Sequence, residues 1–304
     1  MSDHAHDHSG QTHGGRLLVA FSITCVILLA EVVGAILTGS LALVVDAGHM
    51  LTDAGGLGLA LLAARLTARP TTSRRTYGFA RAEVLSATAQ ASVLLGVGLF
   101  VLVEGVQRLV HPPEIASGAL VVFGIVGLVG NVIAIAVLAG GRDANFNLRA
   151  AFLEVVNDAL GSVAVIVAAI VIALTGWTRA DAVAAILIGV LILPRALKLL
   201  RDTVDVLLES VPRGLDLDAV RAHLLEVPHV RAVHDLHVTQ VSSALPVLTA
   251  HIVVEDECFR DGHAPSMLDD LQACVAAHFE VQVEHSTFQL EPAAHAGHEA
   301  DVHP

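Results

Sequence analysis

Residues 40–56 read S-L-A-L-V-V-D-A-G-H-M-L-T-D-A-G-G and place Asp46, His49 and Asp53 inside an otherwise apolar run. A charge at the centre of a membrane-spanning helix costs at least about 2.5–3.5 kcal/mol, so such a group normally faces a cavity, a partner or an ion. His49 and Asp53 are at positions i and i+4, which stacks them on one helix face about one turn apart. The stretch therefore predicts a membrane helix with one polar face.

A second apolar run, 148–174, contains a pair with the same spacing, Glu154 and Asp158. If the two polar faces meet, they offer one imidazole and three carboxylates, a ligand set suited to a divalent metal. The alternative for each group is a simple hydrogen bond to a neighbouring helix. Asp46 is placed to orient the ring of His49, or else is exposed to water near the helix middle. Asn131, in a fourth apolar run, either touches the site or bridges helices.

The composition indicates a membrane protein, because 54% of the 304 residues are hydrophobic and only 15% are charged. Runs of about 20 apolar residues, enough to cross the hydrocarbon core, recur along the first two thirds of the chain. We expect six spans, at residues 16–38, 42–66, 80–109, 115–140, 148–174 and 178–200.

The basic residues fix the expected orientation in the lipid bilayer. The segments on the side of the two termini hold Arg16, Arg65, Arg69, Arg74, Arg75, Arg81, Arg142, Arg149, Arg195, Lys198 and Arg201. The opposite loops hold only Arg108 and Arg179. Because basic residues gather on the cytoplasmic side, both termini are predicted to be cytoplasmic.

The last hundred or so residues have the pattern of a water-soluble domain. A short helix opened by Asp216 is followed by two strands, a second helix and a final strand, an α-β-β-α-β order that suits a small α+β sandwich. The predicted domains are a His-containing leader (1–15), a six-helix transmembrane domain (16–203), a cytoplasmic α+β domain (204–291) and a His-containing tail (292–304). Leader and tail are expected to be disordered, and the three cysteines to be buried thiols.

Four segments together resemble the cation diffusion facilitator family, in its zinc-transporter branch. They are residues 40–56, R-T-Y-G-F-A-R-A-E (75–83), N-D-A-L-G-S (157–162) and V-H-D-L-H-V (233–238). The resemblance covers nearly the whole chain in the right order. It implies a homodimeric exchanger of metal ions for protons in the bacterial inner membrane, with a ferredoxin-like cytoplasmic domain.

The resemblance also implies roles for particular residues. The metal ligands in the membrane are expected to be His49, Asp53, Glu154 and Asp158. A further zinc site, at the dimer interface of the cytoplasmic domain, is expected to use His234, His251 and His285, with the usual fourth position near Thr287, a poor ligand. The alternative for these strand histidines is a structural or surface role. Arg81 and Asp205 match positions whose charges interlock near the membrane surface; the alternative is a topological role for Arg81 and a solvated cap for Asp205.

One departure from the family pattern bears on the choice of metal. Zinc members usually carry His where this chain has Glu154. A further carboxylate hardens the site, which favours a broader selectivity toward manganese, iron, cobalt or cadmium, whereas His49 favours zinc. The histidines of the leader and tail (His4, His6, His8, His13, His295, His298, His303) either capture metal loosely or have no function.

The sequence excludes several other classes of function. The only lysine, Lys198, is not part of a G-x-x-x-x-G-K-[ST] loop, which excludes a Walker-type nucleotide site, and no H-E-x-x-H occurs, so no metalloprotease or other enzyme is predicted. A net charge of −13 argues against a nucleic-acid partner. Because histidine and carboxylates bind metal when deprotonated, exchange of metal for protons is the expected mechanism. A passive metal channel and a metal sensor remain as alternatives.

Overall fold

The six predicted spans are confirmed as six long helices in the computed structural model, which describes residues 9–139, 146–243, 245–277, 279 and 281–296. They are α1 (Ser9–Thr38), α2 (Leu41–Thr67), α3 (Ala82–Val110), α4 (Ser117–Ala139), α5 (Phe146–Thr175) and α6 (Arg179–Leu207). Most ends lie within a few residues of the prediction. The exceptions are α1, which starts before residue 16, and α6, which continues past residue 200.

Five of these helices are long and apolar enough to cross a membrane, among the residues that the structure describes. The remaining long helix, α2, has the length of a span, but Asp46, His49 and Asp53 lower its hydropathy. The chain is thus an integral membrane protein, and the long helix outside this set of five carries the polar face.

The chain divides into two compact units. One combines Met1–Leu59 with Ala89–Leu200, and the other combines Ala60–Thr88 with Arg201–Pro304. The sequence placed the boundary after residue 203 and assigned the whole of 16–203 to the membrane. In the structure the second unit also includes the end of α2, the connection to α3 and the start of α3.

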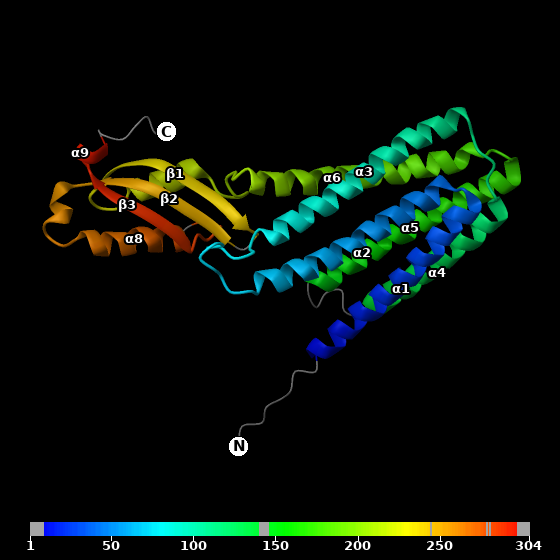
Figure 1. The fold of residues 1–304 in the computed structure, drawn as a ribbon, viewed down its shortest axis with the longest axis horizontal. Helices are drawn as coiled ribbons and strands as arrows, with labels where there is room; N and C mark the ends of the chain where they lie inside the picture. Colours follow the sequence, from blue (N-terminus) through cyan, green and yellow to red (C-terminus); the bar gives the residue numbers. More distant parts are fainter. Residues whose placement is uncertain (1–8, 140–145, 244, 278, 280, 297–304) are drawn as a thin grey trace, which may run out of the picture. The chain divides into compact units, whose positions relative to one another are not determined.

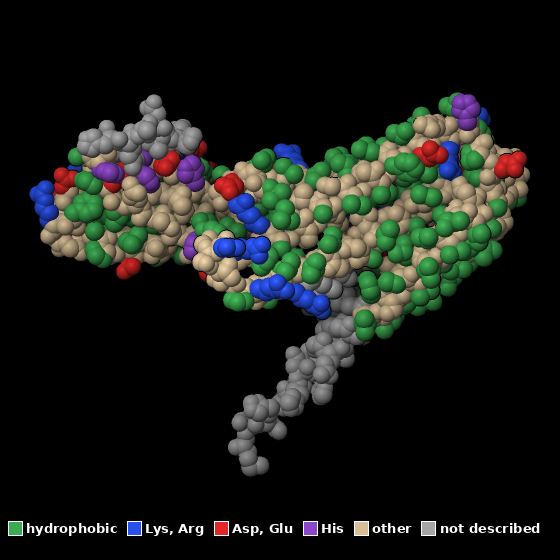
Figure 2. Space-filling view, in the orientation of Figure 1, with side chains coloured by type: hydrophobic (Ala, Val, Ile, Leu, Met, Phe, Trp, Pro, Cys, Tyr) green, Lys and Arg blue, Asp and Glu red, His purple; other side chains and the backbone are tan. Residues whose placement is uncertain are grey.

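The core of the first unit draws on every long helix. Its buried apolar residues include Ala35, Leu43, Val101, Leu120, Val165 and Ala185, one from each of α1 to α6. Large apolar side chains also cover the outside of this unit, as Figure 2 shows. Ile36, Leu174 and Leu191 are more than three-quarters exposed, an arrangement suited to contact with lipid.

Helices α3 and α6 run side by side (Figure 1), and two glycines let them approach closely. A Cβ on Gly98 would lie 2.7 Å from Leu193, and one on Gly105 would lie 2.6 Å from Ile186. Real Cβ atoms do not come so close, so small residues are required at these positions.

The start of α2 is fixed by a carboxylate from α6. Asp181, which is fully buried, accepts hydrogen bonds from the Ser40 hydroxyl and from the backbone N–H groups of Leu41 (2.7 Å) and Ala42 (3.3 Å). The first N–H groups of a helix have no partner within the helix and favour a negative charge. Asp181 therefore caps the helix that carries His49, a role that the sequence analysis did not anticipate.

The second unit contains the expected α+β domain. Its elements are α7 (Leu217–Leu225), β1 (Val230–Ser242), β2 (Leu245–Val254), a 3-10 turn (Asp256–Phe259), α8 (Ala264–Ala277), β3 (His285–Pro292) and α9 (Ala293–Ala296). The Asp216 side chain caps α7, as predicted, by accepting from the N–H groups of Asp218 and Ala219. The strand order is β1-β2-β3, with β2 antiparallel to β1 and parallel to β3.

One face of this sheet packs on α7 and α8. Alternate residues of β2, Leu248, Ala250, Ile252 and Val254, join Val220, Leu224 and Leu271 of the helices in one core. Because side chains alternate along a strand, the residues between them lie on the other face, which we call the second face. Histidine and acidic side chains gather on one side of this domain in Figure 2.

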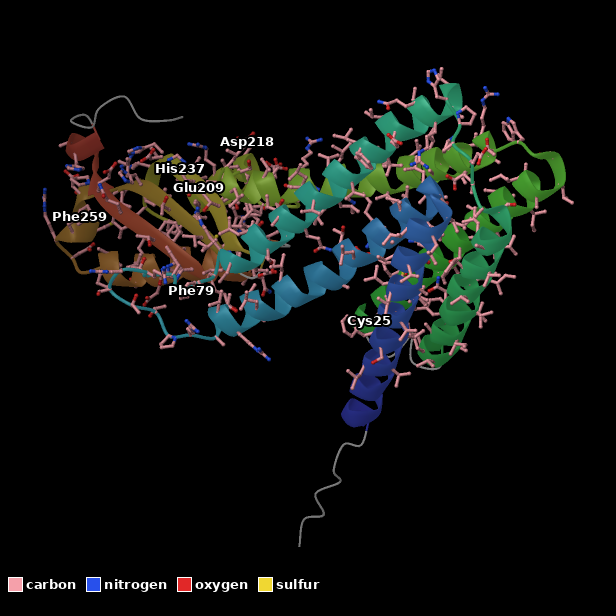
Figure 3. The ribbon with its side chains drawn as sticks, turned by 45° about the vertical axis from the view of Figure 1, so that its right-hand side comes forward. Cys25, Phe79, Glu209, Asp218, His237 and Phe259 are labelled. Atoms are coloured by element: carbon pink, nitrogen blue, oxygen red, sulfur yellow. The ribbon has the colours of Figure 1, made fainter. Side chains whose placement is uncertain are left out.

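Two expectations need correction. Residues 9–15 belong to α1, Pro292 ends β3 and 293–296 form α9, so the leader and tail have regular secondary structure where the structure describes them. Cys258 and Cys274 are buried as predicted, and burial raises the pKa of both thiols, which makes them poor metal ligands. Cys25, in contrast, is exposed on α1 (Figure 3).

The Asp181 cap predicts a graded loss of stability. Asp181→Ala leaves the N-terminal N–H groups of α2 and the Ser40 hydroxyl without their acceptor, and should cost about 1–3 kcal/mol. Asp181→Asn retains an acceptor and should cost less. Thermal unfolding of the two purified variants in detergent measures the difference, and an alanine variant as stable as wild type would show that the cap is not needed.

Candidate metal sites

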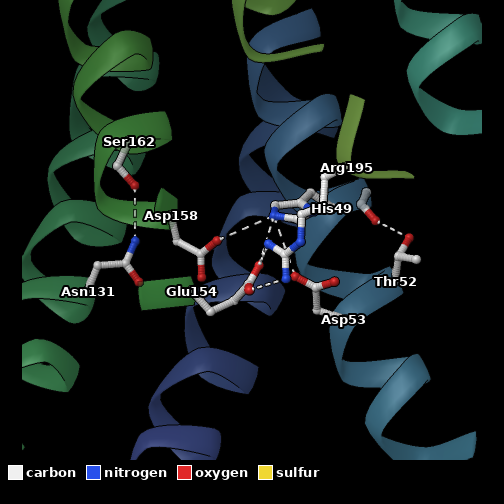
Figure 4. Close-up of polar contacts among 9 residues, drawn as sticks. His49, Thr52, Asp53, Asn131, Glu154, Asp158, Ser162 and Arg195 are labelled. Atoms are coloured by element: carbon white, nitrogen blue, oxygen red, sulfur yellow. Dashed lines mark hydrogen bonds and ion pairs between the residues drawn. The ribbon is translucent and has the colours of Figure 1, made fainter. Parts of the chain in front are cut away.

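The two predicted i, i+4 pairs meet between α2 and α5. His49 Nε2 lies 3.4 Å from Asp53 Oδ2, 3.4 Å from Glu154 Oε1 and 3.9 Å from Asp158 Oδ1 (Figure 4). The ligand atoms of His49, Asp53 and Glu154 all lie within 4.8 Å of one another. One imidazole nitrogen thus faces three carboxylates, with Asp158 at slightly longer range.

Several atoms of this group are buried without a hydrogen-bond partner. They are His49 Nδ1, Asp53 Oδ2 and Asp158 Oδ1. A buried polar atom left unpaired costs free energy, so natural sites leave few of them without a reason. Nitrogen and oxygen donors at this spacing fit a divalent metal as cargo.

Asp46 is not one of the residues whose ligand atoms face His49 Nε2. Its side chain is 2% exposed and neighbours Glu31 of α1, and a Cβ on Gly161 would lie 2.8 Å from its Oδ1. Glu31 is also buried, 2% exposed, and interacts with Asp158 as well. Glu31 was not among the predicted site residues, although an acid in an apolar span is the same signal that identified the other groups.

Asn131 bridges helices, one of its two expected roles. Its side-chain amide lies 3.3 Å from the Ser162 hydroxyl and so joins α4 to α5. Ser162 follows Asp158 by one helical turn, which places the bridge next to the ligand group. The Asn131 Oδ1 is buried without a hydrogen-bond partner.

Arg195 enters the site from α6, which the sequence did not predict. Its guanidinium contacts both carboxylate oxygens of Glu154, at 2.8 Å and 2.6 Å. In the sequence, Arg195 counted only toward the basic bias of the cytoplasmic side. Its position inside an apolar span was a signal of a buried partner.

A second cluster lies on the second face of the sheet in the α+β domain. His234 of β1 pairs directly with His251 of β2, and their rings are 5.2 Å apart. The His234 Nε2 lies 2.5 Å from an oxygen of Glu291, and the His251 Nδ1 lies 3.9 Å from the other oxygen. Ligand atoms of all three residues fall within 4.8 Å of one another, which fits three protein ligands of a zinc ion.

Within one chain His285 does not join this cluster, although the site expected at the dimer interface included it. In β3 it pairs with Val247, four residues before His251, which places it about 13 Å away along the strand. It contacts the ring of Tyr77 instead, with centroids 6.0 Å apart. The place expected for His285 is taken by Glu291, which pairs with Val253 on the same face as His251.

Arg81 and Asp205 do not pair with each other within the chain. Arg81 contacts Glu209, labelled in Figure 3, at 2.7 Å, while Asp205 lies 3.4 Å from Arg213. Arg213 also contacts Asp202. Within one chain these residues thus form two separate ion pairs, and the interlock expected to control the dimer stays a prediction.

Two family profiles match consecutive parts of the chain. The profile described as the cation efflux transmembrane domain matches residues 17–208, and that of the cytoplasmic domain of cation efflux proteins matches residues 212–293. The chain belongs to the cation efflux family.

Relatives in this family are similar along nearly their full length. The metal cation efflux system protein CzcD of Cupriavidus metallidurans is 39% identical over 293 residues, 96% of this chain and 92% of the relative. The zinc transporter ZitB of Escherichia coli is 39% identical over 95% of this chain and 92% of its own. A Bacillus velezensis protein named cadmium, cobalt and zinc/H(+)-K(+) antiporter is 33% identical over 96% and 93%. These relatives are named as efflux proteins and transporters, not as enzymes.

The histidine-containing ends of this cation efflux protein lie largely outside the described residues. His4, His6 and His8 precede the described part, His298 and His303 follow it, and the side chain of His13 is not described. His295, which the structure does describe, lies 3.9 Å from the Glu291 carboxylate. Among the terminal histidines whose side chains the structure describes, His295 therefore lies next to a candidate metal cluster.

The two clusters predict how much zinc the full-length protein binds. His251→Ala should lower the number of zinc ions bound per chain, because the cytoplasmic cluster loses one of three ligands. His285→Ala, a matched histidine removal on β3, should leave that number unchanged. Equilibrium dialysis with metal analysis measures both, and an equal loss in the two variants would contradict the assignment of Glu291 in place of His285.

Proposed function

We propose that this chain exports a divalent transition metal, with zinc as the preferred ion, from the cytoplasm in exchange for protons. The observation that carries the proposal is the buried imidazole of His49 facing the carboxylates of Asp53, Glu154 and Asp158. Membership of the cation efflux family and the names of its relatives support divalent metal as the cargo.

The choice among divalent metals rests on the donor set. An imidazole nitrogen favours zinc, whereas three carboxylates also accept harder ions. The B. velezensis relative is named for cadmium and cobalt as well as zinc. We therefore place zinc first, and cadmium, cobalt, manganese and iron as alternative cargo.

Protons are proposed as the counter-ion because the ligands bind metal in their deprotonated forms. Metal loading from one side then releases protons, and protonation from the other side releases metal, provided that access alternates between the two sides. The name of the B. velezensis relative, which includes H(+), agrees with this coupling.

The assembly and orientation are also part of the proposal. We infer a homodimer in the bacterial inner membrane, from the family of the cytoplasmic domain. Both termini are placed in the cytoplasm, because basic residues favour that side. The cytoplasmic cluster of His234, His251 and Glu291 is proposed as a separate zinc site that stabilises this domain.

Removing a membrane ligand should abolish transport without unfolding the protein. His49→Ala and Asp158→Asn are each expected to lower zinc flux into proteoliposomes by more than roughly tenfold, because the ion loses one of four ligands. Glu104→Gln is the control, since Glu104 is an acid of α3 that pairs with Arg108 and with none of the ligands. Flux at the wild-type rate in either ligand variant would contradict the proposed site.

Proton exchange predicts a dependence on the pH gradient. Zinc uptake into inside-out vesicles with an acidic lumen should rise above the equilibrium level and collapse when a protonophore removes the gradient. A passive channel would carry zinc to the same equilibrium level with or without the gradient. A metal sensor would carry none, so zinc-indicator fluorescence in the vesicle lumen separates the three functions.

A further inference from the structure

The Arg195 guanidinium lies among the proposed metal ligands. Its two terminal nitrogens contact the two oxygens of Glu154 at 2.8 Å and 2.6 Å, a bidentate pairing that Figure 4 shows. One of these oxygens, Oε1, is also the atom that lies 3.4 Å from His49 Nε2. An arginine thus shares with the imidazole a carboxylate that a metal ion would need.

The location of Arg195 inside α6 makes this pairing significant. An arginine in an apolar span is costly, and it normally pairs with an acid or marks the path of an ion. Bidentate arginine–carboxylate pairs are among the stronger ion pairs, and they fix the carboxylate plane. Glu154 is therefore held by a fixed cation that belongs to the protein.

The charges of the ligand group also indicate that Arg195 opposes the binding of a metal ion. In the deprotonated form that binds metal, the three carboxylates around a neutral His49 carry three negative charges, and Arg195 reduces the sum to two. A group with two net negative charges matches a divalent cation, whereas a group with three would retain it more strongly. Arg195 is thus placed to lower the affinity of the group for a divalent metal.

We propose that Arg195 is a built-in counter-cation of the membrane site, which a divalent metal displaces from Glu154 when it binds. The inference rests on the proposed metal function of that site. In the metal-free protein Arg195 occupies the Glu154 carboxylate, and in the loaded protein the metal takes the carboxylate as a ligand. Return of Arg195 to Glu154 favours release, so the residue sets the affinity and the rate of unloading.

The surroundings of Arg195 allow such a displacement. Its side chain is 56% exposed, compared with 23% for Glu154, so the guanidinium has space on one side. The preceding residue, Pro194, lies inside α6. Proline has no N–H for the helical hydrogen bond to the carbonyl four residues earlier, and such positions are where helices bend.

The test compares zinc affinity among variants of the full-length protein in detergent, by titration against a chelating dye at one fixed pH. All variants carry His251→Ala, which removes the cytoplasmic cluster from the measurement. Arg195→Gln should bind zinc roughly tenfold more tightly or more, because a unit positive charge beside the ligands is gone. Zinc release into metal-free buffer should slow in proportion.

Two further variants separate competition from other effects of the charge. Arg108→Gln, which also removes an arginine paired with a glutamate, should bind zinc with unchanged affinity, because Arg108 contacts Glu104 and the Gly39 carbonyl rather than a ligand. Arg195→Lys keeps the charge but loses the bidentate pairing, so its affinity should fall between wild type and Arg195→Gln.

A double-mutant comparison tests the pairing itself. With Glu154→Gln in place, adding Arg195→Gln should raise zinc affinity much less than it does alone, because the two residues no longer compete through one carboxylate. An equal gain in both backgrounds would overturn the proposal, as would unchanged or weaker binding by Arg195→Gln. Should that variant fail to fold, a lysine variant without any gain in affinity would overturn it.

Failure of the inference differs from failure of the proposed function. If His49→Ala binds zinc as tightly as the protein with His49, the membrane site itself is wrong and the inference about Arg195 falls with it. If His49→Ala loses zinc while Arg195→Gln keeps wild-type affinity, the metal site stands and only the role of Arg195 is overturned.

Discussion

The membrane domain is organised by the cost of keeping ionisable groups in an apolar environment. Each such group favours a partner, and the contacts of His49 with Glu154 and Asp158 lie between α2 and α5. The His49 ring and three carboxylates form the centre, Arg195 pairs with Glu154, and Asp46 interacts with His49 and Glu31. Packing of the α2 and α5 faces is thus inseparable from the geometry of the candidate metal site.

Other contacts in the membrane domain help to hold the polar faces of α2 and α5 together. Asp181 fixes where α2 begins, and so sets the rotation and height of His49 relative to α5. Asn131 joins α4 to α5 one turn beyond Asp158. Close approach at Gly98 and Gly105 brings α6 against α3, and Arg195 is carried on α6. Polar side chains thereby determine how the helices are aligned against one another, because their apolar surfaces alone favour no single alignment.

Local spacing explains which parts of this arrangement the sequence predicted. Spans follow from hydropathy, and the pairs His49 with Asp53 and Glu154 with Asp158 follow from the helical repeat, so both were predicted. Contacts between distant segments were not. The Arg195–Glu154 pair joins α6 to α5, and the Asp181 cap joins α6 to α2. Neither contact produces a repeating pattern of residues within one helix, so residue spacing does not predict it.

The cytoplasmic cluster shows the same limit in a β-sheet. His234, His251, His285 and Glu291 all lie on strands, and their spacing within each strand fixes at most the face on which they lie. The register between β2 and β3 decides which residue of β3 reaches His251. That register places Val253 opposite Glu291 and Val247 opposite His285, so the carboxylate is near the histidine pair and the imidazole is not. Helical spacing identified His49, and family resemblance identified His234 and His251, whereas in both clusters long-range pairing selected the charged group that completes the surroundings of the histidine.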